Sequence, residues 1–238
     1  MDVKKEAARV ASTLIDDHTS VGLGDGSTVR MLAEFLIDRM NAGLEIRLYT
    51  SSLSTLEFLK RRGALINDIS RTDTLDTYFD GCDQIDGRLN ALKSGSGIHT
   101  MEKLLASMSK KFVIIGDESK FIQKLDPAFP LVLEALPQAV PFVLKIMHAL
   151  FPGCSLSIRK SQDVEDISAF TINGNHLIDC RFQEWPDLEN IQIQTKKITG
   201  VVEISLFYQI VDEAIIAGRD GIKRYVRRNN QVQLLQTI

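Results

Sequence analysis

The sequence has few cysteines, no long apolar run and almost no net charge. Cys82, Cys154 and Cys180 lie far apart, which excludes a disulfide framework and a Cys-x-x-Cys metal pair. No apolar run approaches the ~18 residues of a membrane-spanning helix, and Met1–Glu6 lacks the apolar core of a secretory signal. The net charge of −3 gives no general attraction to nucleic acid. We therefore expect a cytoplasmic protein with neither membrane nor nucleic-acid partners.

What remains is an ordinary globular composition. A chain of 238 residues is long enough for a sizeable core, or for two domains, and 44% hydrophobic with 25% charged residues is typical of such proteins. The four histidines have no metal-ligand spacing. We expect no metal and no cofactor. The basic run 223–228 is interpreted as a solvated face.

Strand and helix patterns alternate through the first half of the chain. Apolar periodicity predicts helices at 2–15, from Ser27 onward, 54–62 and 101–109, and strands at 21–24, 46–50, 76–79 and 112–116. Such alternation is typical of a doubly wound, mostly parallel, Rossmann-like α/β fold. In these sheets ligands bind beyond the carboxyl ends of the strands.

The pattern changes after Asp126, where Pro127, Pro130 and Pro137 interrupt the chain. A helix at 138–150 and strands near 155–160, 168–172 and 176–181 follow, with an Asn173-Gly174 turn. We expect a smaller α+β domain over 127–202, and a large domain formed by 1–126 and 203–238. The apolar segments 201–207 and 213–217 are expected to rejoin the first sheet.

A glycine-rich turn, Gly24-Asp25-Gly26-Ser27-Thr28, joins a strand to a helix. Glycines allow backbone N–H groups to approach a phosphate, and the helix N-terminus adds partial positive charge. The alternative is a plain turn in which Ser27 or Thr28 caps the helix. The turn is neither a P-loop nor a complete Gly-x-Gly-x-x-Gly motif.

Further downstream, three carboxylates and one lysine fall within a single strand–loop–helix segment. Asp80 and Asp83 suit acid–base work, although Asp-Gly is also a common turn dipeptide. Lys93 opens a Gly/Ser loop and either stabilises an anion or is simply solvated. Glu102 lies at the start of a helix, where it either removes a proton from the substrate or only stabilises the helix through its interaction with the helix dipole. The combination predicts an anion site beside proton-transfer chemistry, which suits a phosphorylated sugar better than a nucleotide or a metal.

Taken in series, these motifs resemble ribose-5-phosphate isomerase of type A. The resemblance rests on Gly24–Thr28, Ser51-Ser52, Asp80–Gln84, Lys93–Gly97, Thr100–Lys103, Asp117–Lys120, and a tail with Ile198–Val202, Ser205–Phe207 and Asp220–Lys223. It covers most of the first 125 residues and is looser in the middle. It implies a metal-free aldose–ketose isomerase of the pentose phosphate pathway, with a ferredoxin-like smaller domain and assembly into a homodimer or homotetramer.

The resemblance also implies a role for each site residue. Glu102 matches the base that moves a proton between C1 and C2, Asp80 and Asp83 match the carboxylates of ring opening and hydroxyl proton transfer, and Lys93 matches the cation that stabilises the enediolate. The positions implied to contact the sugar phosphate are Asp25, Gly26, Ser27, Thr28, Gly81, Cys82, Ser94, Gly95, Ser96 and Lys120.

The chain departs from the family's usual pattern at four positions. Asp25 stands in place of threonine, Gln84 in place of glutamate, and Ser94 and Ser96 interrupt a glycine run. Two alternatives therefore stay open beside the isomerase: a sugar-phosphate binder without catalysis, and an isomerase for a different sugar phosphate.

Overall fold

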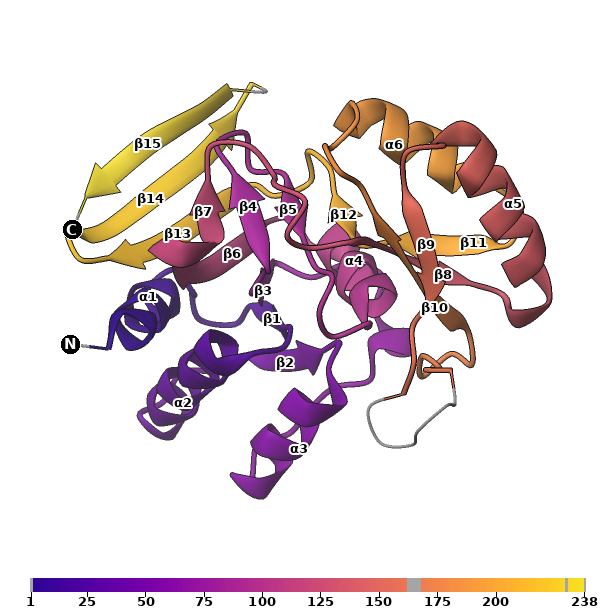
Figure 1. Ribbon diagram of the computed structural model, residues 1–238. Coiled ribbons are helices and arrows are strands. Elements are labelled where there is room, and N and C mark those ends of the chain that lie inside the picture. Colours follow the sequence, from indigo (N-terminus) through magenta and orange to yellow (C-terminus); the bar gives the residue numbers. More distant parts are fainter. Residues whose placement is uncertain (1, 162–167, 230, 238) are drawn as a thin grey trace.

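The computed structural model of the chain describes residues 2–161, 168–229 and 231–237 (Figure 1). Its largest sheet has the strand order β15-β14-β13-β6-β3-β1-β2. The parallel strands are β2 (Arg47–Thr50), β1 (Ser20–Leu23), β3 (Thr77–Asp80), β6 (Phe112–Asp117) and β13 (Glu213–Gly218). An antiparallel hairpin of β14 (Gly221–Arg228) and β15 (Gln231–Thr237) extends the sheet beyond β13. The predicted mostly parallel α/β architecture is confirmed.

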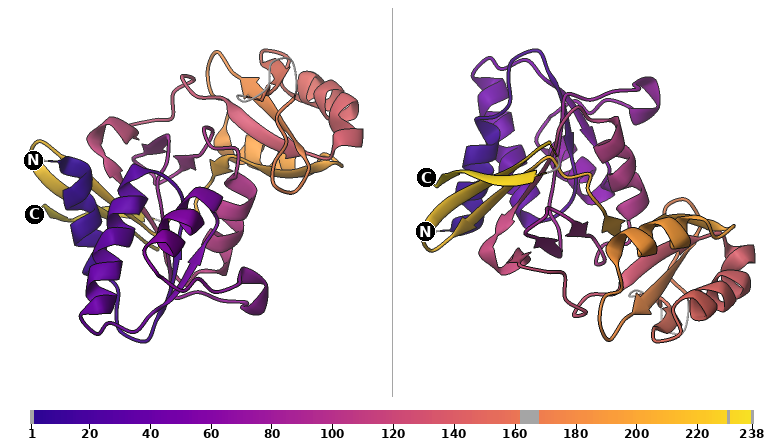
Figure 2. Two further views of the ribbon diagram at one scale, coloured as in Figure 1. Left: turned by 90° about the horizontal axis from the view of Figure 1, so that it is seen from below. Right: turned by 90° about the horizontal axis from the view of Figure 1, so that it is seen from above.

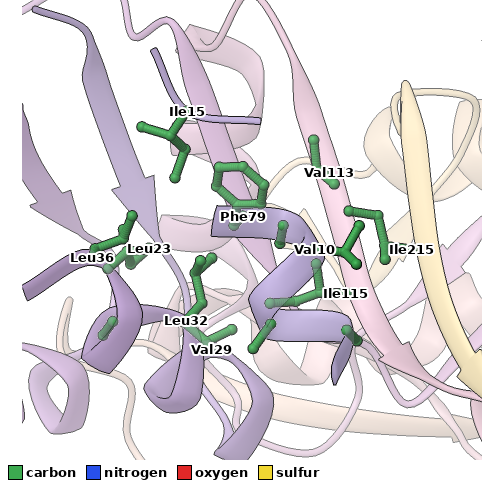
Figure 3. Close-up of a cluster of buried hydrophobic side chains, with 14 of the residues drawn as sticks. Val10, Ile15, Leu23, Val29, Leu32, Leu36, Phe79, Val113, Ile115 and Ile215 are labelled. Carbon is green, nitrogen blue, oxygen red and sulfur yellow. The ribbon is translucent and has the colours of Figure 1, made fainter. Parts of the chain in front are cut away.

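Helices cover both faces of this sheet. They are α1 (Val3–Ser12), α2 (Ser27–Asn41) and α3 (Leu53–Arg61) on one side, and α4 (His99–Met108) on the other. Successive residues of a strand point to opposite faces. Val113 and Ile115 accordingly pack with α1 and α2 in the core that Figure 3 shows, whereas Phe112 and Ile114 pack with Leu105 of α4. Both faces are buried, which explains the continuous apolar run of β6.

A second, much smaller sheet lies on the side of the core that α4 covers. Its strands are β12 (Leu206–Phe207), β5 (Ala91–Leu92), β4 (Gln84–Asp86) and β7 (Phe121–Ile122). Ile85, Ala91 and Phe207 are fully buried there. Strands of two or three residues are too short for a recognisable alternation, so the sequence did not predict β4, β5 and β7 and placed β12 within the longer apolar segment 201–207. The β4–β5 hairpin returns the chain from Asp80 to Lys93 and thereby brings the two side chains together.

The remaining sheet is antiparallel, in the order β11-β8-β10-β9. It consists of β8 (Leu131–Ala135), β9 (Ser155–Ile158), β10 (His176–Arg181) and β11 (Val201–Ile204), with helices α5 (Val140–Leu150) and α6 (Leu188–Lys196). The chain order β-α-β-β-α-β with this strand order is the predicted ferredoxin-like fold. Figure 2 shows this part beside the large sheet, and α4 contacts its strand β11. Short 3₁₀ turns occupy Ile69–Arg71, Glu118–Lys120 and Pro137–Ala139.

Three expectations from the sequence were wrong in detail. Residues 168–172 form only isolated bridges, because Thr171 to Asn175 make a tight turn and leave Phe170 and Ile172 exposed. Residues 201–204 pair with β8 instead of rejoining the large sheet, which only β13 does. The basic run 223–228 lies within β14, where Arg224 pairs with the buried Glu213. The division into 1–126 with 203–238 and 127–202 stays a prediction.

No helix among the described residues is long and apolar enough to cross a membrane.

Candidate active site

A cavity of ≈ 250 Å³ lies beyond the carboxyl ends of β1, β3 and β6. Parallel sheets place ligands at this edge. Its lining includes eleven of the residues predicted from the sequence, namely Asp25, Gly26, Ser27, Thr28, Gly81, Cys82, Asp83, Lys93, Ser96, Glu102 and Lys120. Asp80, Ser94 and Gly95 do not line the cavity. They contact the lining residues Lys93 and Asp83, as described below.

Lys93 lies buried between two carboxylates. Its Nζ is 3.0 Å from Asp80 Oδ2 and 3.2 Å from Glu102 Oε1, and it donates a hydrogen bond to the carbonyl of Gly81 at 2.5 Å. Burial by itself would lower the pKa of Lys93, but the charges of Asp80 and Glu102 outweigh that effect and hold its pKa above the ordinary value. Lys93 therefore presents a fixed positive charge to the cavity.

Asp80 is fully buried at the end of β3. Its Oδ1 accepts hydrogen bonds from the N–H groups of Gly81 (2.7 Å) and Asp25 (3.2 Å). Its Oδ2 accepts the Tyr78 hydroxyl at 2.6 Å as well as the ammonium of Lys93. A Cβ on Gly24 would come within 2.1 Å of this carboxylate, so the glycine at that position makes room for Asp80.

Glu102 is 1% exposed and lies in the first turn of α4. Burial, and then the nearby charge of Asp80, raise the pKa of Glu102 well above its ordinary value, although Lys93 counteracts part of this. Its Oε2 is buried and accepts no hydrogen bond from any residue that the structure describes. A carboxylate with a raised pKa and one free oxygen has the properties of a general base.

The loop after Lys93 is held by Asp83. The Oδ2 atom of Asp83 accepts hydrogen bonds from the N–H groups of Ser94 (2.6 Å) and Gly95 (2.8 Å). The Ser94 hydroxyl donates to the carbonyl of Pro130 at 2.5 Å, away from the cavity. The serine at 94 therefore fastens the loop to the segment that precedes β8, while Ser96 faces the cavity.

The more exposed end of the cavity is the N-terminus of α2, where Gly26 and Ser27 are exposed. Gly26, with φ of 108°, precedes the helix and offers no side chain to cap it. The first-turn N–H groups of Ser27 and Thr28 are thus left for a ligand, with the positive end of the helix dipole behind them. Lys120 and Lys4 also line this end, and Lys4 Nζ lies 3.8 Å from Asp117. The arrangement suits a phosphate group.

Asp25 adds a negative charge near this end. Its Oδ1 accepts the hydroxyl of Ser54 at 2.9 Å, and Arg30 donates to the same Ser54 oxygen at 2.7 Å. The carboxylate is thus drawn toward α3 and is linked through one hydroxyl to a cation. The side chain still borders the cavity.

Cys82 and Gln84 differ in their relation to the cavity. Cys82 lines it, and burial raises the pKa of this thiol to about 12, so it stays protonated and unreactive. Gln84 is buried and turned away from the cavity. Its Nε2 donates to Asp126 Oδ1 at 2.7 Å, and its Oε1 accepts the N–H of Asp126 at 3.2 Å. The amide at 84 is therefore explained by Asp126 and not by a ligand.

Sequence reasoning missed some residues of this region. Lys4 lies twenty positions before the first motif, at Gly24, and carries no pattern of its own, so nothing in the sequence pointed to it. Tyr78 lies two residues before Asp80 on the same strand, and the period of two would have placed both side chains on one face. No group of three or more potential metal ligands occurs among residues 2–161, 168–229 and 231–237.

The chain was compared with protein families and with proteins of known structure. The family model described as ribose 5-phosphate isomerase A (phosphoriboisomerase A) matches residues 47–221. Ribose-5-phosphate isomerase A of Archaeoglobus fulgidus is 36% identical over 226 residues, covering 94% of this chain and 98% of the relative. The Bacillus mycoides protein of the same name is 34% identical, over 94% of this chain and all of the relative.

Solved structures agree. Ribose 5-phosphate isomerase from Plasmodium falciparum superposes with a TM-score of 0.88 at 28% identity, covering 96% of this chain and 100% of its own. A D-ribose-5-phosphate isomerase in complex with phospho-erythronic acid gives a TM-score of 0.87 at 28% identity, covering 95% and 98%. The similarity extends over nearly the whole length of these proteins. The chain belongs to the ribose 5-phosphate isomerase A family.

Proposed function

We propose that this protein interconverts D-ribose 5-phosphate and D-ribulose 5-phosphate through an enediolate. The observation that carries the proposal is the pairing of Glu102 with Lys93 in one cavity. Glu102 Oε1 lies 3.2 Å from the ammonium of Lys93, and Glu102 Oε2 is buried without a hydrogen-bond partner among the described residues. The anion-binding end at α2 lies across the same cavity. A base, an oxyanion partner and a phosphate site are the three groups that this reaction requires.

Glu102 fits the role of the base. It removes the proton from C2 of the open-chain aldose, and the C–H electron pair forms the C1=C2 double bond while the carbonyl oxygen O1 becomes negative. Return of the first proton from Glu102 to C1, with transfer of the O2 hydroxyl proton to O1, gives the ketose. Because burial raises the pKa of Glu102, the ionised carboxylate accepts the proton more readily than an exposed glutamate would.

Lys93 fits the role of the cation that stabilises the enediolate oxygen. Its position is set before substrate arrives, since Asp80, Glu102 and the Gly81 carbonyl already hold the ammonium. Such preorganised charge needs no rearrangement during the reaction. Asp80, with four donors around its two oxygens, acts in this proposal by orienting Lys93 rather than by touching the sugar.

Asp83 borders the cavity and is the carboxylate that we assign to ring opening and hydroxyl proton transfer. Its Oδ2 is engaged by the loop, which leaves Oδ1 for the sugar. For the substrate, we assign the contacts of the phosphate to the turn 25–28, to Lys120 and to Lys4. Gly81, Cys82 and the loop 94–96 complete the proposed binding residues. A related isomerase binds phospho-erythronic acid, whose planar carboxylate is chemically similar to an enediolate.

The experiment is an aldose–ketose assay with ribose 5-phosphate in the presence of a chelator, on wild type and Glu102→Gln. Wild type should convert the substrate, and the variant should lose roughly 10²- to 10⁴-fold in kcat with little change in KM. Glu6→Gln is a matched control, because Glu6 also lies in the first turn of a helix. Near-normal turnover of Glu102→Gln would contradict the role of this residue.

The two alternatives have separate outcomes in the same experiment. Conversion of another pentose or hexose phosphate in preference to ribose 5-phosphate would identify a different isomerase. Calorimetric binding of ribose 5-phosphate without any conversion would identify a binding protein. Asp25 and Ser96 are the departures that border the cavity, and Asp25, which adds a charge there, is the first to revert in either case.

We further propose that the protein acts in the cytoplasm as a homodimer or homotetramer. The buried free thiols Cys154 and Cys180 suit a reducing compartment. Leu136, Phe142 and Leu150 lie exposed at and near α5, at 46%, 50% and 40% of their surface, and offer an apolar area for self-association. Light scattering coupled to gel filtration measures the oligomer, and a monomer at micromolar concentration would contradict this proposal.

A further inference from the structure

Arg159 reaches from the ferredoxin-like part of the chain to the loop that follows Lys93. It comes directly after β9, more than sixty residues from the loop. Its Nη2 donates to the carbonyl of Ser94 at 2.9 Å and its Nη1 donates to the carbonyl of Gly95 at 3.2 Å. One guanidinium thus binds two consecutive peptide groups, which only the forked geometry of arginine allows.

The same two residues, Ser94 and Gly95, are also bound by Asp83. Asp83 accepts the N–H groups of Ser94 and Gly95, while Arg159 donates to their carbonyls. The Ser94–Gly95 peptide is therefore bound by a charged side chain at both its C=O and its N–H, and charge-assisted hydrogen bonds are the stronger kind. Next to this clamp, Gly97 packs against Leu177 so closely that a Cβ would come within 2.5 Å of it.

Arg159 is itself held in place. Its Nε donates to Asp179 Oδ1 at 3.0 Å, and its Nη2 lies 2.5 Å from the same oxygen. The Arg159 side chain is 19% exposed and that of Asp179 is 16% exposed. Asp179 lies on β10, in the middle of the antiparallel sheet. The orientation of the guanidinium is therefore set by the sheet and not by the loop.

We propose that Arg159 is a positioning residue that keeps the loop 94–96 in its substrate-binding shape. This inference rests on the proposed function, in which that loop contacts the sugar phosphate. Lys93 and Glu102 do not depend on Arg159, because they are held by each other, by Asp80 and by Gly81. Loss of Arg159 therefore weakens substrate binding and spares the chemical step.

The kinetic test compares Arg159→Ala, Arg159→Lys and wild type. We expect the alanine variant to raise KM roughly tenfold while kcat stays within about threefold, since two hydrogen bonds to a charged donor are lost. The lysine variant keeps the charge beside Asp179 but does not span both carbonyls, so its KM falls between. Arg62→Ala removes an arginine from an ion pair with Glu34 on another part of the chain and serves as the matched control.

A merely structural role gives a different result. Partial unfolding lowers the apparent kcat and leaves KM unchanged, because the remaining folded molecules bind normally. That outcome, or an unchanged KM in Arg159→Ala, would overturn the proposal. If the alanine variant does not fold, the lysine variant decides in the same way.

A second measurement does not need catalysis. Amide hydrogen exchange at residues 94–97 reports the loop directly, and we expect faster exchange in Arg159→Ala than in wild type or Arg62→Ala. Equal exchange rates would overturn the positioning role. If wild type fails to isomerise ribose 5-phosphate, the proposed function fails, while this comparison still decides whether Arg159 holds the loop.

Discussion

The two ends of the cavity are built in opposite ways. At the inner end, Asp80, Lys93 and Glu102 are 0%, 6% and 1% exposed, respectively. The ammonium of Lys93 lies within 3.2 Å of both carboxylates. At the outer end, Ser27 is exposed, the N-terminus of α2 lacks a side-chain cap, and Lys120 lines the wall. The inner end is complete without a ligand, whereas the outer end offers the N-terminus of α2 and Lys120 to an anion, with the partly exposed carboxylates of Asp25 and Asp117 nearby.

This difference separates chemistry from binding. Charges that are held in advance lower a reaction barrier without rearrangement, and they are costly to remove because their partners are left buried and unpaired. Open helix ends and solvated lysines contribute mainly to affinity, and their removal leaves the fold intact. The same substitution should therefore have unlike effects at the two ends.

The largest effect is expected from Lys93→Met at the inner end. The variant leaves Asp80 and Glu102 buried side by side without their cation, so we expect a loss of about 3–5 kcal/mol in the free energy of unfolding. Loss of the enediolate partner should lower kcat roughly 10²- to 10³-fold. Urea unfolding and steady-state kinetics measure the two effects. A stable variant with normal kcat would show that the inner end is not preorganised as described.

The contrast between these ends also explains how far the sequence could be interpreted. Asp80, Lys93 and Glu102 were predicted together because each follows a strand or opens a helix in a parallel fold, which brings them to one edge of the sheet. Lys4, Tyr78 and Arg159 were not predicted. The importance of Lys4 and Arg159 depends on long-range contacts that local patterns do not contain, whereas the period of two along β3 would have placed Tyr78 on the same face as Asp80.

The fold shows the same limit. Buried strands such as β6 and amphipathic helices such as α1 were predicted from periodicity, whereas the short strands β4, β5 and β7 were not. Residues 168–172 alternate like a strand, but their chain turns back at Gly174 before a ladder forms. Local pattern defines an element only where the element is long enough to bury one face.

The next effect is a pH dependence of stability that arises from His99 on α4, the helix that carries Glu102. His99 is fully buried on α4, facing Lys103, Glu134 and Glu203, and burial lowers its pKa to about 4. In the unfolded chain histidine titrates near 6.5. Between pH 6.5 and pH 4 the unfolded state therefore binds more protons than the folded state. The contribution of His99 to the free energy of unfolding is present above pH 6.5, and on the order of 3 kcal/mol of it is lost as pH falls toward 4.

His99→Gln removes this titration and keeps a hydrogen-bond donor for the carbonyl of Glu203. We expect the difference in unfolding free energy between pH 7 and pH 4.5 to be smaller in the variant than in wild type. Parallel pH profiles of the two proteins would show that His99 does not contribute. The outer end of the cavity contains no buried histidine among the described residues, so it should not add to the pH dependence of the unfolding free energy.

A smaller effect is expected at the outer end. Lys120→Met is the same substitution as at Lys93, but we expect KM for ribose 5-phosphate to rise about tenfold with kcat nearly unchanged. The unfolding free energy should change by less than about 0.5 kcal/mol, as for other surface substitutions. The rise in KM should diminish at high salt, because screening weakens the attraction of the phosphate in wild type as well. A large fall in kcat would place Lys120 with the inner end.

The smallest kinetic effect is expected from Gln84→Glu, which restores the residue usual in the family. Gln84 belongs to neither end, because its amide is paired with Asp126. A glutamate there would set a carboxylate against Asp126 Oδ1, so we expect a loss of about 1–2 kcal/mol in unfolding free energy at pH 7 and less than a twofold change in kcat or KM. The exposed Gln123→Glu controls for added charge. A marked change in KM instead would mean that residue 84 influences the substrate, and that the buried inner end extends beyond the three residues that define it here.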